Sequence, residues 1–202
     1  MLLMLQDTEC IIVFIWKEFS MLTSERLTLR PLEESDASTC LALEIKNRAL
    51  FSKYSGSRKP VFYTLEYQIE SIRRAKKGWE EDTKYDFGIF LIETGQMIGS
   101  IALNEVMRGA LQSCYVGYSL DGEHNGKGYM SEALALVVTF GFEVLKLHRI
   151  EAGVMPVNIG SQRVLEKCGF VREGLARKNV NIQGKWEDHY SYGILNPADQ
   201  AE

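Results

Sequence analysis

The chain has 202 residues, of which 46% are apolar and 25% charged, and its formal net charge at pH 7 is −4. This is the composition of an ordinary globular domain, and a chain of this length can bury about 70% of its unfolded surface in one core. The mild acidity argues against binding to a nucleic-acid backbone, which a basic stripe would favour. We therefore expect one domain, no nucleic-acid partner and no metal.

Four cysteines lie far apart in the sequence, and no two of them form a CxxC pair; they are Cys10, Cys40, Cys114 and Cys168. This spacing indicates neither a thiolate metal site nor the disulfide framework of a secreted protein. We interpret the cysteines as reduced thiols of a cytoplasmic protein.

The first 20 residues contain the apolar stretch Cys10–Trp16. It is too short for a bilayer, which needs about 20 residues, and the chain start lacks the cationic region of a secretory signal. We expect no membrane partner. Met21 offers a second start, so we expect an extension at 1–20, a domain at 21–197 and a tail at 198–202. The alternative for the extension is an extra edge strand or helix packed on the domain.

The first half of the domain combines one strand with two helices. Apolar periodicity predicts, in chain order, a strand over Arg26–Leu32, a helix over 37–48 and a helix over 65–78 behind the capping residue Thr64. The segment Asn47–Pro60 carries Ser, Gly, Pro and four basic residues without periodicity. This pattern is typical of a loop.

The second half alternates strands and helices, which predicts a single mixed α/β domain. We expect strands over Tyr85–Ile92 and Gln96–Leu103, a bulge or loop over Asn104–Gln112, a strand over Cys114–Leu120, an amphipathic helix that ends near Lys146, a strand over His148–Met155, a helix over Asn158–Cys168, and a hairpin over Phe170–Leu195.

Gly126-Lys127-Gly128 lies between a predicted strand and a predicted helix. Glycines let backbone amides approach a phosphate, and a helix N-terminus presents unpaired N–H groups with about half a positive charge. A pyrophosphate would fit this turn, although the sequence completes neither the P-loop nor the dinucleotide fingerprint. The alternative is a tight turn that only redirects the chain.

The segments around this turn resemble the acyl-CoA-binding half of the GCN5-related N-acetyltransferase superfamily; they are CYVGYSL, EHNGKGYM, HRIEAGVMP and NIGSQRVLEKCGF. SERLTLRPL, NRALF, LEKCGFVREGLARKNV and QGKWEDHYSYGIL extend the likeness over about residues 21–196 and are most similar to the ribosomal-protein-alanine N-acetyltransferase branch. The resemblance implies a mixed, mostly antiparallel sheet flanked by helices. It also implies transfer of an acetyl group from acetyl-CoA to a primary amine in one ternary complex.

The resemblance further implies where acetyl-CoA binds. Strand backbone would pair with the pantetheine arm, loop amides would hold the pyrophosphate, and Asn158 would hydrogen-bond the pantetheine or serve as a helix cap. The superfamily has Gln or Arg where this chain has Glu123, so the loop amides are carried over and the Glu123 side chain is not. The implied binding residues are Tyr118, Leu120, Asn125, Gly126, Lys127, Gly128, Tyr129, Met130 and Asn158.

Two residues are candidates for catalysis. By resemblance, the Ser161 hydroxyl would lie near the sulfur as general acid; its alternative is to complete a helical turn. An α-amine, with a pKa of about 7.7–8.0, needs less help to lose its proton than a lysine at about 10.4. A carboxylate acting through water would suffice, and Glu105 is our candidate base, although it can equally be a solvated acid. Relatives place carboxylates where this chain has Tyr115 and Val180.

The acceptor favoured by the resemblance is the N-terminal α-amine of a protein such as a ribosomal protein. A small amine, such as a polyamine or an antibiotic, is the enzymatic alternative, and a non-catalytic acyl-CoA sensor is another. The basic segment with Arg48, Tyr54, Arg58 and Lys59 is expected to border the acceptor site or to be a solvated loop. Both a monomer and a homodimer remain open.

Overall fold

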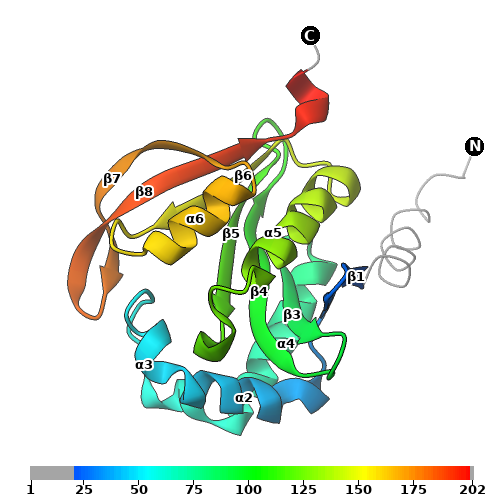
Figure 1. Cartoon of the computed structure of the whole chain (residues 1–202), viewed down its shortest axis with the longest axis vertical. Coiled ribbons are helices and arrows are strands. Elements are labelled where there is room, and N and C mark those ends of the chain that lie inside the picture. Colours follow the sequence, from blue (N-terminus) through cyan, green and yellow to red (C-terminus); the bar gives the residue numbers. More distant parts are fainter. Residues whose placement is uncertain (1–20, 201–202) are drawn as a thin grey trace, which may run out of the picture.

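Eight strands form one sheet with strand order β1-β2-β3-β4-β5-β6-β8-β7 in the computed structural model, which describes residues 21–200 (Figure 1). The strands are β1 (Leu22–Thr23), β2 (Leu27–Arg30), β3 (Tyr85–Leu91), β4 (Met97–Met107), β5 (Ser113–Leu120), β6 (Arg149–Val154), β7 (Val171–Ile182) and β8 (Lys185–Leu195). Only β5 and β6 pair in parallel among these strands. The expected mixed, mostly antiparallel sheet is confirmed. The predicted extension at 1–20, with Cys10, and residues 201–202 lie outside the described residues.

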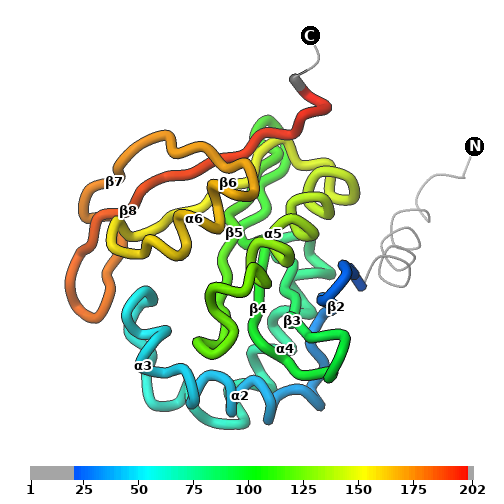
Figure 2. The backbone as a smooth tube through the Cα atoms, in the orientation of Figure 1, coloured from blue at the N-terminus to red at the C-terminus, as the bar shows by residue number. Residues whose placement is uncertain are grey.

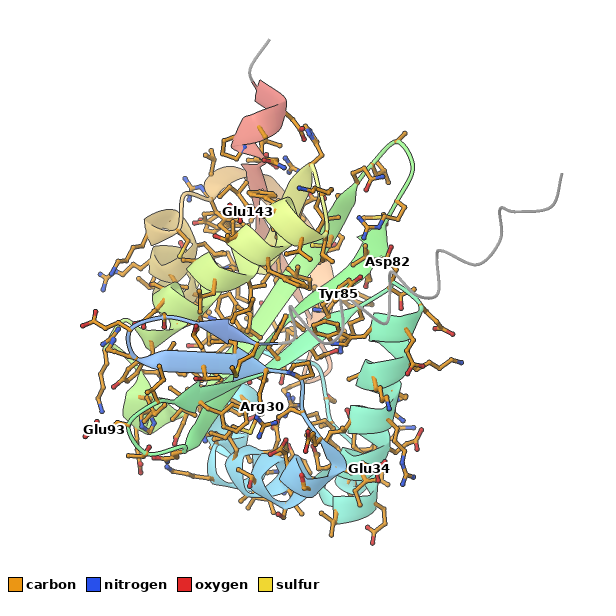
Figure 3. The ribbon with its side chains drawn as sticks, turned by 90° about the vertical axis from the view of Figure 1, so that its right-hand side faces the viewer. Arg30, Glu34, Asp82, Tyr85, Glu93 and Glu143 are labelled. Carbon is orange, nitrogen blue, oxygen red and sulfur yellow. The ribbon has the colours of Figure 1, made fainter. Side chains whose placement is uncertain are left out.

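Helices cover both faces of the sheet. They are α2 (Ala37–Lys46), α3 (Arg48–Phe51), α4 (Leu65–Glu80), α5 (Tyr129–Thr139) and α6 (Ile159–Lys167). Figure 3 shows α5 and α4 on opposite sides of the strands. Within residues 21–200, none of the helices combines the length and the hydropathy that crossing a membrane requires.

Each face of the sheet has its own apolar core. The larger core joins the sheet to α5 and α6 and contains Phe87, Ile101, Leu134 and Leu165, each at most 1% exposed. A smaller core lies beneath α2 and α4; its buried members are Ala37, Cys40, Ile72 and Met97. Burial of both apolar faces fixes the sheet between two helical layers.

The predicted loop over Asn47–Pro60 is wrong at its start, because Arg48–Phe51 forms the helix α3. Asn47, with φ −100° and ψ 11°, interrupts the helical backbone between α2 and α3. Phe51 then turns into the protein and is 8% exposed. A single turn of helix is too short to show apolar periodicity, so the sequence pattern could not indicate it.

Two further boundaries differ from the expected ones. Strand β4 runs on to Met107 instead of ending at Leu103, and the expected bulge is a register shift between Asn104 and Met107 within that strand. Helix α5 does not continue to Lys146, because its last part widens into the π-helical turn Phe140–Val144. There the Leu145 N–H donates to the Phe140 carbonyl at 3.1 Å.

Close approach of β4 and β5 depends on Gly99. A Cβ at this position would lie 2.4 Å from the backbone oxygen of Ser119, which cannot move aside as a flexible side chain can. Gly174 of β7 offers a matched control, because a Cβ there would meet nothing within 4 Å and its φ is not positive.

We predict that Gly99→Ala lowers the free energy of unfolding by about 1–3 kcal/mol, the usual cost of overpacking, or more if the two strands separate. Gly174→Ala should stay within about 0.5 kcal/mol of the parent chain. Urea unfolding followed by circular dichroism measures both. Equal effects of the two substitutions would contradict the packing at Gly99.

Candidate active site

Strands β5 and β6 are paired over a short segment only and then separate. They pair in parallel only where Ser113–Tyr115 faces Arg149–Glu151. Beyond this point the other edge of β5 stays paired with β4 as far as Leu120, and the other edge of β6 stays paired with β8 as far as Val154. The β5–β6 ladder therefore ends after Tyr115 and Glu151, and Figure 1 shows the two strands diverging beyond that point; we call this break in the ladder the opening. Peptide groups of β5 that face this opening can hydrogen-bond an extended ligand.

The glycine turn lies where β5 leads into α5, at one end of this opening. Gly126 has φ +76°, Gly128 has φ +82°, and a Cβ at Gly126 would meet nothing within 4 Å. Gly128 is the N-cap of α5, and no side chain caps that helix. The turn thus presents backbone N–H groups without side-chain cover, which is the donor set that a pyrophosphate requires.

An ionic cluster holds the turn from the side of β2. Arg26 donates to Glu132 through Nε at 2.8 Å and to the Lys127 carbonyl through Nη1 at 3.1 Å, and its guanidinium lies 4.5 Å from the ring centre of Tyr129. Burial works to raise the pKa of Glu132, but hydrogen bonds from Ser24 and Arg26 hold it below its usual range. Glu132 therefore stays ionised and keeps the turn attached to β2.

A second cluster ties the turn to the end of α2. The Lys46 ammonium lies 2.7 Å from both Asp121 Oδ2 and Glu123 Oε2, and the buried Asn47 accepts a hydrogen bond from Gly122 N–H at 2.9 Å. Burial works to raise the pKa of Asp121, yet the hydrogen bond from Lys46 helps to hold it below its usual range. Glu123 has 72% of its side chain exposed, and it shares the single positive charge of Lys46 with Asp121.

Two hydroxyls meet on the α6 side of the opening. The Tyr118 hydroxyl lies 2.9 Å from Ser161 Oγ. Burial raises the pKa of Tyr118 to about 12, so this phenol stays protonated at neutral pH. Asn158 caps α6 by accepting from Ser161 N–H at 3.2 Å. The capping alternative for Asn158 is thus confirmed, and this cap fixes the backbone that carries Ser161.

Glu105 lies near Tyr115, which points away from the larger core because its neighbours Cys114 and Val116 point into that core. Glu105 occupies the bulge of β4 with φ +53° and is exposed. Its charge is close enough to Tyr115 to contribute to a raised pKa of that phenol, after the larger effect of Glu151 and the effect of burial. Asn104, next to Glu105, pairs with Tyr115 across the two strands. The two catalytic candidates therefore approach the opening from opposite faces.

The remaining predicted donor-site residues divide between the surface of the turn and the core. Asn125 and Lys127 are exposed in the turn, whereas Leu120 and Met130 are 9% and 5% exposed and belong to the larger core. Leu120 and Met130 can therefore offer only backbone groups to a ligand. Their side chains fix the end of β5 and the first turn of α5.

Among the described residues, Cys40 and Cys114 are buried and Cys168 is partly buried. Cys114 is 0% exposed, and burial raises its pKa to about 12. Burial also raises the pKa of Cys168, whose Sγ donates to the Ser131 carbonyl at 3.3 Å. A protonated, buried thiol is a poor nucleophile. In the described part of the chain, no three His, Cys, Asp or Glu side chains are grouped so that they could hold a metal.

Two arginines of the basic segment after α2 contact acidic or aromatic side chains within the fold. Arg58 pairs with Glu44 and lies 4.2 Å from the ring centre of Phe62, and Arg48 lies 4.4 Å from that of Tyr63. The tip of the β7–β8 hairpin reaches this segment, since Gln183 Nε2 donates to the Ser55 carbonyl at 3.3 Å (Figure 2). The hairpin and α3 thereby frame one approach to the opening.

Sequence reasoning missed the residues that hold the site together. These are Arg26, Lys46, Asn47, Arg149 and Glu151. Their partners include residues 75 to 106 positions away along the chain, as in Lys46 with Asp121 and Arg26 with Glu132. No local pattern can indicate such pairs.

A parallel strand pair that opens beside a glycine turn at a helix N-terminus is the arrangement that the sequence resemblance implies for an acyl-CoA-binding acetyltransferase. The comparisons with known proteins agree. Residues 26–171 match the model of the acetyltransferase (GNAT) domain family. The chain is 51% identical over 180 residues to the Bacillus subtilis protein named probable N-acetyltransferase YjcK, a match that covers 89% of this chain and 99% of the relative.

Two solved structures share the fold. A ribosomal-protein-S5-alanine acetyltransferase from Vibrio fischeri is 30% identical with a TM-score of 0.84, over 88% of this chain and 97% of that one. RimJ of Mycobacterium smegmatis, solved in complex with CoA-disulfide, is 26% identical with a TM-score of 0.81, over 87% of this chain and 84% of that one. The chain belongs to the GCN5-related N-acetyltransferase (GNAT) family, and it is an acyltransferase whose acetyl donor is acetyl-CoA.

Substitution in the glycine turn tests the donor site. We predict that Gly126→Val raises the Kd for CoA at least tenfold, because a branched side chain at positive φ distorts the turn and blocks access to its amides. Isothermal titration calorimetry measures this change.

Gly95 supplies the control. It has φ +68° and equally open surroundings, but it lies in the turn between β3 and β4. Gly95→Val should lower the melting temperature and leave the Kd for CoA unchanged. An unchanged Kd in Gly126→Val would exclude the turn as the pyrophosphate site.

Proposed function

We propose that the chain transfers the acetyl group of acetyl-CoA to the N-terminal α-amine of a protein, such as a ribosomal protein, in one ternary complex. The observation that carries this proposal is the opening between β5 and β6, with the glycine turn at one end and catalytic candidates on both faces. The ribosomal-protein acetyltransferase among the similar structures supports the choice of acceptor.

Donor binding is assigned to backbone groups. The amides from Gly126 to Met130 would hold the pyrophosphate, since the Asn125 N–H donates to the Gly122 carbonyl at 3.3 Å. The free edge of β5, near Tyr118 and Leu120, would pair with the pantetheine arm. Asn158 contributes by capping α6 and, through its amide nitrogen, is available to the arm. The Arg26 and Lys46 clusters keep this frame in place before the donor arrives, which lowers the ordering cost of binding.

The leaving sulfur needs a proton. Bound acetyl-CoA supplies a thioester whose C–S bond breaks as a C–N bond forms to the acceptor amine. Ser161 is proposed to give its hydroxyl proton to the departing sulfur. The Tyr118 phenol, protonated at neutral pH, lies within hydrogen-bond distance of Ser161 Oγ and can restore that proton. Tyr118 then regains a proton from solvent, which receives the proton that the acceptor amine loses. The thiols of Cys114, which is buried, and Cys168, which is partly buried, take no covalent part in this scheme.

The attacking amine must lose a proton. Glu105 is proposed to accept it through a water molecule from the face opposite Ser161. A protein α-amine suits a distant carboxylate, because about a tenth of it is already neutral at pH 7, whereas a lysine amine is almost wholly charged. A protein α-amine is therefore a better acceptor group for the exposed base Glu105 than a lysine amine.

A small polyamine is the second candidate acceptor. Glu105 and Glu151 both raise the pKa of Tyr115, and two carboxylates at the acceptor face would also attract a compact cation.

We propose further that the catalytic unit is residues 21–197 and that it works in the cytoplasm, where the free thiols Cys40, Cys114 and Cys168 would stay reduced.

Release of the CoA thiol on a panel of acceptors tests the function. The purified chain with acetyl-CoA should release CoA with peptides that carry a free N-terminal alanine or serine, and much more slowly with spermidine or with N-terminally blocked peptides that contain lysine. Faster release of CoA with spermidine than with the peptides would show that the acceptor is a polyamine and not a protein. Binding of acetyl-CoA without release for any acceptor would indicate a sensor and contradict the proposal.

Ser161→Ala tests the general acid. We expect kcat to fall by about a hundredfold, in the range typical of one acid–base group, while the Kd for acetyl-CoA stays within about twofold. Thr94→Ala is the control, because it removes a hydroxyl that accepts a hydrogen bond from the Gln96 N–H in the turn between β3 and β4, away from the opening. An unaltered kcat in Ser161→Ala would remove the acid role.

A further inference from the structure

A cluster of charged side chains lies on the sheet face opposite α5 and α6. Arg149 of β6 donates through Nη2 to Glu151 Oε2 at 3.2 Å and through Nη1 to Glu173 Oε1 at 2.9 Å. Gly193 makes room for this guanidinium, because a Cβ there would lie 2.5 Å from Nη2. The absence of a side chain at Gly193 thus lets Arg149 lie flat on β8 and hold both carboxylates.

Glu151 is the last residue of β6 that pairs with β5. It pairs with Tyr115 in the last step of the parallel ladder, directly before β5 and β6 part. Paired residues on neighbouring strands point to the same face, so both side chains lie at the vertex of the opening. Both are accessible: Tyr115 is 41% exposed, and the Glu151 side chain is 25% exposed.

The charge at this vertex is negative. Glu151 is the largest cause of the raised pKa of Tyr115, ahead of burial and of Glu105, so both carboxylates act at the same hydroxyl. Arg149 supplies one cation, and it is shared between Glu151 and Glu173. The excess of carboxylates favours a cationic ligand and opposes an anionic one.

We propose that Glu151 determines acceptor specificity: its carboxylate receives the ammonium group of the acceptor beside Tyr115 and disfavours acceptors with an acidic group next to that amine. This inference rests on the proposed function, since it takes the face of Glu105 as the acceptor side. Glu151 orients the amine, and proton removal stays with Glu105. The preferred acceptor is an N-terminus whose second residue is neutral or basic.

Two isosteric peptides test this inference. Ala-Gln-Tyr and Ala-Glu-Tyr amides share the same acceptor residue and differ by one charge near the amine. We expect the parent chain to have a higher kcat/KM for the Gln peptide, and Glu151→Gln to reduce this preference by about fivefold, chiefly through KM. Glu151→Asp keeps the charge and should keep the preference.

Glu173→Gln is the matched control. It removes a carboxylate of the same cluster from β7, which lies two strands beyond β6 in the sheet, and should leave the preference within about twofold. An unchanged preference in Glu151→Gln, or an equal loss in Glu173→Gln, would overturn the role of Glu151. If the parent chain releases no CoA with either peptide, the proposed function itself fails. Melting temperatures of all variants show whether the fold is kept.

Discussion

The separation of β5 from β6 after three paired residues is the constraint on which the rest of the site depends. Beyond this point β5 stays hydrogen-bonded to β4 and β6 stays hydrogen-bonded to β8, so both strands remain part of the sheet. The gap leaves peptide groups of β5 available to a ligand and joins the two faces of the sheet at one point. The glycine turn, the Tyr118–Ser161 pair and the Tyr115–Glu151 pair all take their positions relative to it.

Electrostatic pairs hold the elements around this opening in register. Arg26 attaches the turn to β2, and Lys46 attaches it to α2, while Arg149 organises the carboxylates at the vertex. The Arg26 and Lys46 side chains in these pairs are 43% and 42% exposed, so solvent screens the pairs and each adds little to stability by itself. Their contribution is positional, because each joins a loop or strand end of the site to an element packed in one of the two cores.

The sequence predicted the parts of the fold that leave a periodic or short-range signal. The hairpin at Gly95, the strand before Gly126 and the helix behind Asn158 all correspond to observed elements. It failed where one turn of helix carries too few residues, as in α3, and where a helix changes its winding, as at Phe140–Val144. The resemblance to a family indicated the glycine turn and Ser161. It could not indicate Lys46 or Glu151, because their roles arise from contacts between distant segments.

A crystal structure of the chain with CoA tests the central claim most directly. The account predicts pantetheine between β5 and β6, hydrogen-bonded to the β5 backbone beyond Tyr115, with the pyrophosphate on the amides of Gly126–Met130. CoA bound at any other place, or a closed β5–β6 ladder in the complex, would contradict it.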